Sequence, residues 1–555
     1  MPYDPNATWT AATNSGALEP VYYIVISGLA ARHYSTGPVL SPSAQKYLVL
    51  QTPDSVSQKL AQLQGRSSLT LTDLRLVDAA GIITEIIATE RASPIFDTLL
   101  NRTVVVYSGY RAIPESAYAP VFEGQIDALS FDGSATYTLR LVDIRRTAND
   151  EIMVNADASG TIPIATTLAS GASAGALAFA VVSSVNITEG AYLMLGPNAT
   201  GDEDKVYVGS VVGGTIFIGA VTEGVAAVPL AHTYAAGADV RWASTIIEGH
   251  PLNILYAVLT GEFTNPLFPL VRAQGLPTGM GLSPSSVKTA DIVADRDRWS
   301  TGEVWRFEFR SSAAGFRFIE QKISRLLGYT SVTQDGLETF RAYRPPFPEV
   351  AGAGLPTITK NDVLEWEWVR AHDLHVNRVS LGVDLDPQSG APGTTVTVED
   401  TADQASTAET AEMADDDTGL RSSLNGISLA QQYGEGLLRR FKKPPDQFRV
   451  TLGLRRRALS VGDVVSVTHP DFPNIRTGFR GVTAYRLEVV ERQESMAEGR
   501  VKLLLQDAGF IRPAAWAPES GAASYTVATA AEKEYAAWGP ESGDFADGGR
   551  PYEWA

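Results

Sequence analysis

Residues 458–470, ALSVGDVVSVTHP, decide the fold class of this chain. The polar turn SVGD at 460–463 leads into VVSVT at 464–468, and this alternating pattern predicts a β-strand. A helical pattern at 427–441 precedes the turn, and a long β-rich run at 481–507 follows it. Together these segments predict a β-barrel-type module. The turn carries no catalytic arrangement of side chains, which argues against an enzyme.

Length and composition favour a large, turn-rich protein of several domains. A chain of 555 residues holds about three or four domains. Hydrophobic residues make up 44%, enough for packed cores, and 49 Gly and 31 Pro favour many turns. The expected fold class is mainly β with α+β parts. No cysteine is present, so disulfides and thiolate metal sites are excluded.

The net charge and the hydropathy of the chain disfavour nucleic-acid binding, secretion and membrane insertion. The net charge of −18 disfavours passive binding to nucleic-acid backbones, which requires clustered cations. The start, MPYDPNATWT, has no charged segment followed by an apolar stretch, so no signal peptide is expected. Residues 158–188 are uncharged, but they are rich in Gly, Ser and Thr and contain Pro163, so we expect no membrane-spanning helix there.

Residues 1–156 are predicted to form a first β-barrel-type domain. A turn at 78–81 is expected before the apolar run 82–88, and Asp132-Gly133 predicts a hairpin turn. Alternating or apolar runs that predict strands lie at 21–29, 47–50, 68–76, 82–88, 103–109, 122–126 and 137–144.

Residues 157–243 are predicted to be a small all-β insertion into the preceding domain. Charge nearly vanishes at its start, and short strand patterns follow at 191–195, 205–208 and 215–218. Residues 244–364 predict an α+β middle domain. Helical patterns lie at 252–259 and at 314–327, which ends at Gly328, and a hairpin is expected around Asp335-Gly336.

Residues 365–512 predict a second β-barrel-type domain. Its first strand is expected at 365–381. Between Arg378 and Arg421 there are ten acidic residues and no Lys or Arg, so 383–420 is expected to be a mobile acidic loop. A basic run follows, and we favour pairing of its charges within the protein or between subunits over contact with DNA; it comprises Arg439, Arg440, Lys442, Lys443, Arg449, Arg455, Arg456 and Arg457.

Residues 513–555 form an acidic tail with regularly placed aromatic residues. WAPESG at 516–521 recurs as WGPESG at 538–543, and the chain ends PYEWA. Such spacing predicts an extended tail that docks onto a partner rather than a domain with its own core. The candidate docking residues are Trp516, Pro518, Trp538, Pro540, Tyr552 and Trp554.

Three patterns could carry chemistry, and each is better explained as structure. GASAG at 171–175 matches a nucleophile elbow but lacks the strand before it and the helix after it. His372 and His375 would diverge on the expected strand, and no cysteine could complete a zinc site. The acidic triplets 202–204 and 415–417 lack the spacing of a calcium loop. We therefore expect no catalytic residue, cofactor or metal.

The order of these pieces resembles the tail-tip or baseplate hub proteins of long-tailed bacteriophages and gene transfer agents. The resemblance covers about residues 21–150 and 245–512, and it is carried by the order of several short segments. They are VFEGQI at 121–126, YTLRLVD at 137–143, HPLNIL at 250–255, DGLETF at 335–340, VNRVS at 376–380 and ALSVGDVVSV at 458–467. The insertion and the tail depart from the family pattern.

The resemblance implies a structural virion protein made in the bacterial host cytoplasm. A homotrimer would place two barrels per subunit in a ring at the tail tip, and take part in host attachment and DNA ejection. The ring would bind the distal tail protein and central fibre or other tip proteins. Its channel would pass the tape measure protein and then phage DNA without binding it specifically.

Two other functions remain open from the sequence. A receptor- or glycan-binding tail protein would use the insertion and the aromatic tail as its binding parts. A tail-associated cell-wall hydrolase would need two carboxylates placed across a cleft.

Overall fold

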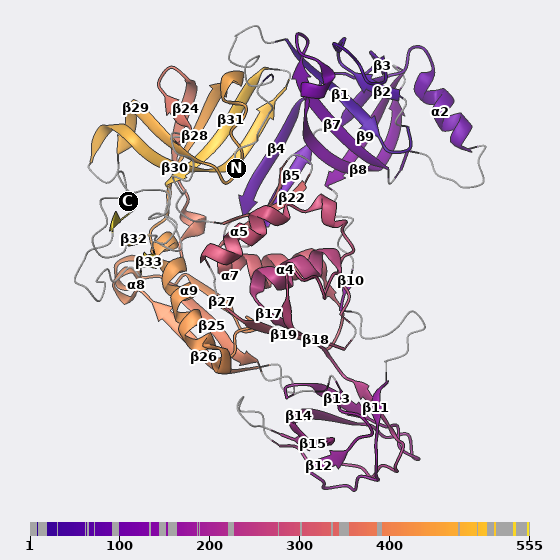
Figure 1. The fold of residues 1–555 in the computed structure, drawn as a ribbon. Coiled ribbons are helices and arrows are strands. Elements are labelled where there is room, and N and C mark those ends of the chain that lie inside the picture. The colour runs from indigo at the N-terminus through magenta and orange to yellow at the C-terminus, as the bar shows by residue number, and fades with distance from the viewer. Residues whose placement is uncertain are drawn as a thin grey trace.

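The computed structural model is built mainly of β-strands, which confirms the predicted fold class (Figure 1). Among the described residues, no helix is both long and apolar enough to cross a membrane. The residues that the structure describes are 8, 19–29, 32–61, 63, 66–91, 99–132, 135–143, 151–153, 164–219, 227–334, 337–342, 355–385, 391–474, 478–507, 515–517, 537–539 and 552–553, without 72, 101, 186, 188, 276, 300, 301 and 497.

The first barrel-type sheet has the strand order β3-β2-β1-β7-β8-β9-β6. It closes because Leu50 bridges Leu76 of β6, while the backbones of Val49 and Gln51 bond to β6 on either side. Its strands and short helix are β1 (Pro20–Ile26), β2 (Arg32–Ser35), β3 (Gln45–Tyr47), β6 (Leu74–Val77), β7 (Thr103–Tyr110), η2 (Glu115–Ala117), β8 (Ala119–Asp132) and β9 (Thr136–Asp143).

The strand expected at 82–88 is wrong, because this segment is the helix α2 (Ile82–Arg91). The carboxylate of Asp78 accepts hydrogen bonds from the backbone N–H groups of Ile83 (2.8 Å) and Thr84 (2.9 Å). These bonds satisfy donors that the first helical turn leaves without a partner, so the polar turn caps a helix instead of closing a hairpin.

A hairpin that follows β3 in the chain extends the second barrel-type sheet. Its strands are β4 (Ser55–Ala61) and β5 (Arg66–Leu71). Strand β4 pairs antiparallel with β30 (Phe479–Ser495), where Lys59 lies opposite Glu491. In Figure 1, β4 runs between the two barrel-type sheets, which lie side by side.

The insertion is a small closed sheet of six strands, in the order β11-β16-β13-β14-β15-β12. The bridge between Leu168 and Val181 joins its two ends. The predicted strands at 191–195, 205–208 and 215–218 are confirmed, and the sheet lies at the end of the molecule remote from the two barrel-type sheets (Figure 1). Its strands are β11 (Ile164–Thr167), β12 (Ala178–Ala180), β13 (Tyr192–Leu195), β14 (Asp204–Val212), β15 (Thr215–Ile218) and β16 (Asp239–Trp242).

The middle region combines a small sheet with helices. The helix expected at 314–327 is confirmed, and Gly328 ends it with φ 67°. Its elements are β10 (Glu151–Ile152), β17 (Thr245–Gly249), α4 (Pro251–Thr260), β18 (Leu270–Gln274), η3 (Pro284–Ser286), α5 (Thr289–Trp299), β19 (Trp305–Phe309), β20 (Ala313–Ala314), α6 (Gly315–Phe318), η4 (Ile319–Ser324), α7 (Arg325–Leu327), β21 (Tyr329–Gln334) and β22 (Leu337–Ala342).

The second barrel-type sheet contains the turn at 460–463, as expected. Gly462 has φ 85°, and the Asp463 carboxylate accepts a 2.7 Å hydrogen bond from the backbone N–H of Ser460. The strand order is β23-β29-β30-β31-β28-β24, with β4 added beside β30. Besides β30, its elements are β23 (Thr357–Thr359), β24 (Val363–Arg370), β28 (Asp446–Gly453), η7 (Leu454–Arg456), β29 (Val464–Asn474) and β31 (Arg500–Asp507).

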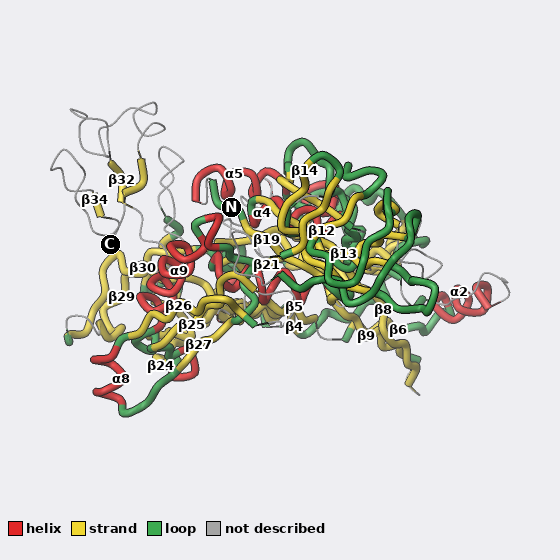
Figure 2. The backbone as a smooth tube through the Cα atoms, turned by 90° about the horizontal axis from the view of Figure 1, so that it is seen from below, coloured by secondary structure: helices red, strands yellow, loops and turns green. Residues whose placement is uncertain are grey.

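The predicted mobile acidic loop at 383–420 is wrong. Most of this segment is regular structure, and Val398 packs against helix α9 near Gly434. Figure 2 shows α9 lying over β25 and β26. The elements of this region are η5 (His372–Leu374), β25 (Arg378–Leu385), β26 (Pro392–Glu399), α8 (Thr401–Thr407), β27 (Glu412–Asp415), η6 (Ser422–Leu424) and α9 (Gly426–Phe441).

Candidate functional site

The contact between the two barrel-type sheets centres on a buried ion pair. Arg457, directly after η7, places its Nη2 2.6 Å from Oε1 of Glu494 on β30, and each side chain is only 1% exposed. The other carboxylate oxygen of Glu494 lies 2.6 Å from Nη2 of Arg492. Both oxygens therefore have a cationic partner, as a carboxylate removed from water requires.

Arg457 also reaches the first barrel-type sheet. Its Nη2 lies 3.4 Å from the hydroxyl of Tyr22 on β1 and donates to the hydroxyl of Ser108 on β7. The guanidinium carbon lies 5.5 Å from the ring centre of Tyr22 and 5.8 Å from that of Tyr110. A single side chain thus contacts both sheets.

The surroundings of Glu494 keep it ionised. Burial alone would raise the pKa of Glu494, but Arg457 and Arg492 outweigh burial and lower the pKa below its ordinary value. For Tyr22, burial is the main cause of a raised pKa, so its hydroxyl stays neutral and donates a 3.4 Å hydrogen bond to Glu494.

Ala458, next to Arg457, also contacts the first barrel-type sheet. Ala458 packs against the cluster formed by Val21, Tyr23, Tyr110 and their neighbours on the outer face of the first sheet. The backbone carbonyl of Arg457 accepts a 3.1 Å hydrogen bond from Arg492. The residues directly before the turn at 460–463 therefore contact the first barrel-type sheet, which the sequence does not indicate because Arg457 and Tyr22 are far apart in the chain.

The basic run is largely paired within the chain, which supports the expected charge pairing. Arg440 lies 2.6 Å from Glu488 in a buried pair, and Arg456 lies 2.9 Å from Asp362. Arg449 pairs with Glu367 at 2.7 Å and Lys442 with Asp400 at 3.4 Å, both nearer the surface. Of these carboxylate partners, only Asp400 belongs to residues 383–420, which we call the acidic segment.

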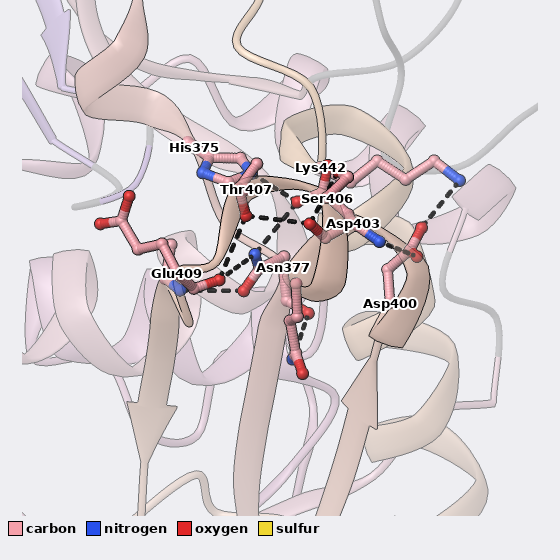
Figure 3. Close-up of polar contacts among 10 residues, drawn as sticks. His375, Asn377, Asp400, Asp403, Ser406, Thr407, Glu409 and Lys442 are labelled. Atoms are coloured by element: carbon pink, nitrogen blue, oxygen red, sulfur yellow. Dashed lines mark hydrogen bonds and ion pairs between the residues drawn. The ribbon is translucent and has the colours of Figure 1, made fainter.

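Asn377 organises the acidic segment (Figure 3). Its Nδ2 donates to Asp403 Oδ2 (3.0 Å) and to the carbonyl of Glu409 (2.9 Å), and its Oδ1 accepts from the N–H of Ala411 (2.8 Å). The hydrogen bond from Asn377 is the main cause of a lowered pKa for Asp403, and His375 acts in the same direction. These bonds order a segment that the sequence suggests is unstructured.

The two histidines considered for a metal pair have separate environments. His375 Nε2 lies 2.8 Å from Asp403 Oδ2, whereas His372 is exposed. They lie at the 3₁₀ turn η5, so the strand expected there is wrong and β24 ends at Arg370. The described residues include no group of three or more His, Asp or Glu placed to hold a metal ion.

The remaining candidates for chemistry also have structural positions. Ser173 of GASAG is exposed in a turn, where its carbonyl accepts a hydrogen bond from Ala176. Asp204 of the first acidic triplet pairs with His232 at 2.9 Å. Asp415 of the second lies 2.8 Å from Nζ of Lys322.

The two copies of the tail repeat pair with each other through their backbones. Trp516 on β32 (Ala515–Ala517) lies opposite Trp538 on β33 (Ala537–Gly539) and opposite Tyr552 on β34 (Tyr552–Glu553). Pro518, Pro540 and Trp554 lie outside the described residues. Docking by these six residues stays a prediction.

Comparison with known proteins yields similarity to solved structures alone. No protein-family model matches the chain, and no curated protein matches it. The 43 kDa tail protein of prophage MuSo2 from Shewanella oneidensis is 8% identical, with TM-score 0.37, over 88% of this chain and 99% of that one. A tail protein from Neisseria meningitidis is 9% identical, with TM-score 0.38, over 89% of this chain and 98% of that one.

A third similar structure is a prophage tail protein from Listeria monocytogenes. It is 9% identical, with TM-score 0.31, and the match covers 82% of this chain and 88% of that one. Because all three TM-scores lie below 0.5, these similarities assign neither a family nor a function.

Proposed function

We propose that this chain is the structural hub of a phage tail tip or baseplate. Three copies form a ring below the tail tube, and this ring connects the distal tail protein to central fibre or other tip proteins. The ring encloses the channel through which the tape measure protein and then the DNA pass. The protein is made in the host cytoplasm and resides in the virion.

The observation that carries the proposal is the pair of barrel-type sheets held side by side in one chain. The Arg457–Glu494 pair and the β4–β5 hairpin fix their arrangement. Three such chains would present six similar units around an axis, and repeated head-to-tail contacts close such a ring. The sequence segments that carry the resemblance to hub proteins lie in these two sheets and in the helices and strands beneath them.

The side chains that were candidates for catalysis or metal binding contact other groups of the protein, and this also favours a scaffold role. His375, Asp204 and Asp415 each contact a charged neighbour within the protein. Asp403 and Asp400, which are close in sequence, cap and order a local segment. These contacts use the polar groups to hold the fold.

The charge balance suits a channel for DNA. The net charge is −18, and Arg440, Arg456 and Arg457 point their charges at carboxylates of the same chain. Phosphates are held by available cations, so a surface with few of them lets DNA slide.

Mass measurement tests the proposal. Analytical ultracentrifugation of the full chain, with negative-stain images of the main species, should give a trimer with a central opening. A protein that stays monomeric at all accessible concentrations would contradict it. So would a ring whose lumen is lined with unpaired lysines and arginines.

A further inference from the structure

Aromatic side chains bring together the two ends of the second barrel-type sheet. Among the described strands, β24 pairs only with β28, and β23, at the other end of the strand order, pairs only with β29. The ring centre of Phe472 on β29 lies 4.8 Å from that of Trp366 on β24 and 4.8 Å from that of Phe448 on β28. Contacts between these rings therefore close the space between β29 and β24.

His469 on β29 is part of this aromatic packing. Its ring centre lies 4.4 Å from that of Phe472 and 6.0 Å from that of Trp366, and the residue is only 4% exposed. We call Trp366, Phe448, His469 and Phe472 the aromatic seam. Within the seam, His469 is the member that can take up a proton and become charged.

The closed seam requires a neutral His469. Its Nδ1 accepts a 3.2 Å hydrogen bond from the backbone N–H of Asp471, and a ring nitrogen accepts only when it carries no proton. Protonation of Nδ1 would turn a second N–H group toward the N–H of Asp471. It would also place a cation among rings from which water is largely excluded, which is unfavourable.

Two charged groups among the described residues act on His469 in opposite directions. They are Asp471 on β29 and Lys360 between β23 and β24, and their exposed side chains pair with each other at 3.7 Å. Burial is the main cause of a lowered pKa for His469, while Asp471 raises this pKa in part and Lys360 lowers it. The folded protein therefore favours the neutral ring.

The strands packed against His469 turn apolar side chains toward it. Val482, opposite His469 on β30, is buried. Charged residues of β24 and β28 lie on the other face of each strand, because Glu365 and Glu367 alternate with Trp366, and Arg449 alternates with Phe448. These charges do not offset the cost of an imidazolium in the seam.

We propose that His469 is a pH-sensitive switch whose protonation opens the aromatic seam and loosens β24 and the end of β29. An opened ring reaches water and binds a proton with an ordinary pKa of about 6.5, whereas the packed ring resists protonation. The seam is therefore most stable above about pH 6.5, and its stability falls as the pH drops below this value. Such an opening is local and leaves the other domains folded.

Hydrogen exchange of the full chain, read by mass spectrometry, tests the proposal. We expect amides of 363–370 and 464–474 to exchange up to about 30-fold faster at about pH 5 than at about pH 7.5, after correction for intrinsic rates. His469→Asn keeps an acceptor near the position of Nδ1 but does not titrate, so it should abolish this increase. His232→Asn, at a 38% exposed histidine of the insertion, is the matched control and should retain it.

The possible outcomes decide for or against the switch. An increase that is absent in the wild type, or equally large in His469→Asn, would overturn the proposal. So would an equal increase at 192–195 in the insertion, because the acid effect would then not be local to the seam. If His469→Asn does not fold, His469→Phe, which keeps an aromatic ring that cannot be protonated, takes its place with the same expectation. The comparison of the seam with 192–195 in the wild type decides without any variant.

Discussion

Arg457 and Glu494 form an ion pair, with 2.6 Å between Nη2 and Oε1, from which water is almost fully excluded. Arg457 lies just before the turn that leads to β29, and Glu494 lies near the end of β30. Since Arg457 also contacts Ser108 and Tyr22, the pair joins the two barrel-type sheets. Loss of Glu494 would leave the Arg457 charge buried without this counterion, and loss of Arg457 would leave Glu494 with Arg492 as its remaining cationic partner.

Replacing one partner should therefore destabilise the protein strongly. We expect Arg457→Met to lower the free energy of unfolding by about 3–5 kcal/mol, measured by chemical denaturation. The matched control is Arg449→Met, because the pair of Arg449 with Glu367 is exposed and should contribute less than about 1 kcal/mol. Equal losses in the two variants would contradict the role given to the buried pair.

The double variant separates charge from packing. Arg457→Met/Glu494→Met removes the two most deeply buried charges while keeping side chains of similar length, and Arg492, which is 16% exposed, loses its bond to Glu494. We expect it to be more stable than Arg457→Met, because desolvation opposes much of the attraction in a buried pair. A double variant less stable than Arg457→Met would show that the contacts of Glu494 with Arg492 and Tyr22 outweigh the cost of burying its charge.

The same pair should make stability depend on pH in the acidic range. The pKa of Glu494 is lowered in the folded state, so its stabilisation is present above the unfolded value of about 4.3 and is lost as the pH falls through the folded value. We expect the stability difference between wild type and Glu494→Gln to shrink as the pH falls below about 4. A difference that is constant from neutral pH to about pH 3 would contradict this expectation.

Asn377 should control the order of the acidic segment. The Asn377→Ala variant would leave the Asp403 carboxylate, the Glu409 carbonyl and the Ala411 N–H each without a partner that they have now. We expect a loss of about 1–3 kcal/mol and faster hydrogen exchange at 400–411. Gln431→Ala, at an exposed position of α9, is the control and should leave this exchange unchanged. Unchanged exchange in the Asn377 variant would rule out the role.

The sequence predicts those elements whose signals are local. Helix α9 has a clear apolar period, and Gly328 ends helix α7. Gly462 with Asp463 marks the turn before β29. In each case neighbouring residues supply both the pattern and its end. No distant contact is needed to recognise them.

The predictions that are wrong or missing concern contacts between residues that are far apart in the sequence. The acidic segment looks disordered by composition, but Val379, Leu381 and Val383 of β25 are buried, and Asn377 and Lys442 supply polar partners from outside it. Similarly, no spacing in the chain indicates that Arg457 meets Tyr22. Alternation likewise predicts a strand at β24 but not the partial exposure of Trp366 and Trp368, because alternation does not say which face a neighbour covers.

The paired basic run predicts weak binding to DNA. We expect no measurable binding of duplex DNA by fluorescence anisotropy at physiological salt, because few cations are available to replace counterions on the phosphates. Glu365→Lys/Glu367→Lys adds two cations and removes the partners of Arg449 and Arg500, so it should bind DNA more tightly and with strong salt dependence. Tight binding by the wild type would contradict the proposed channel surface.

The tail repeat should act in docking to a neighbouring tail protein. Trp516 and Trp538 lie opposite each other in the backbone ladder and share the sequence context W-x-P-E-S-G, so we expect the two positions to act together. Trp516→Ala/Trp538→Ala should weaken docking by about 1–2 kcal/mol per residue, which is about 5- to 30-fold each. Incorporation of the variant chain into assembled tails, measured against Tyr535→Ala as a control within the tail, gives the comparison. If the double tryptophan variant and the Tyr535→Ala control are incorporated equally, the repeat does not dock through its tryptophans, because truncating an anchor must weaken the contact that it makes.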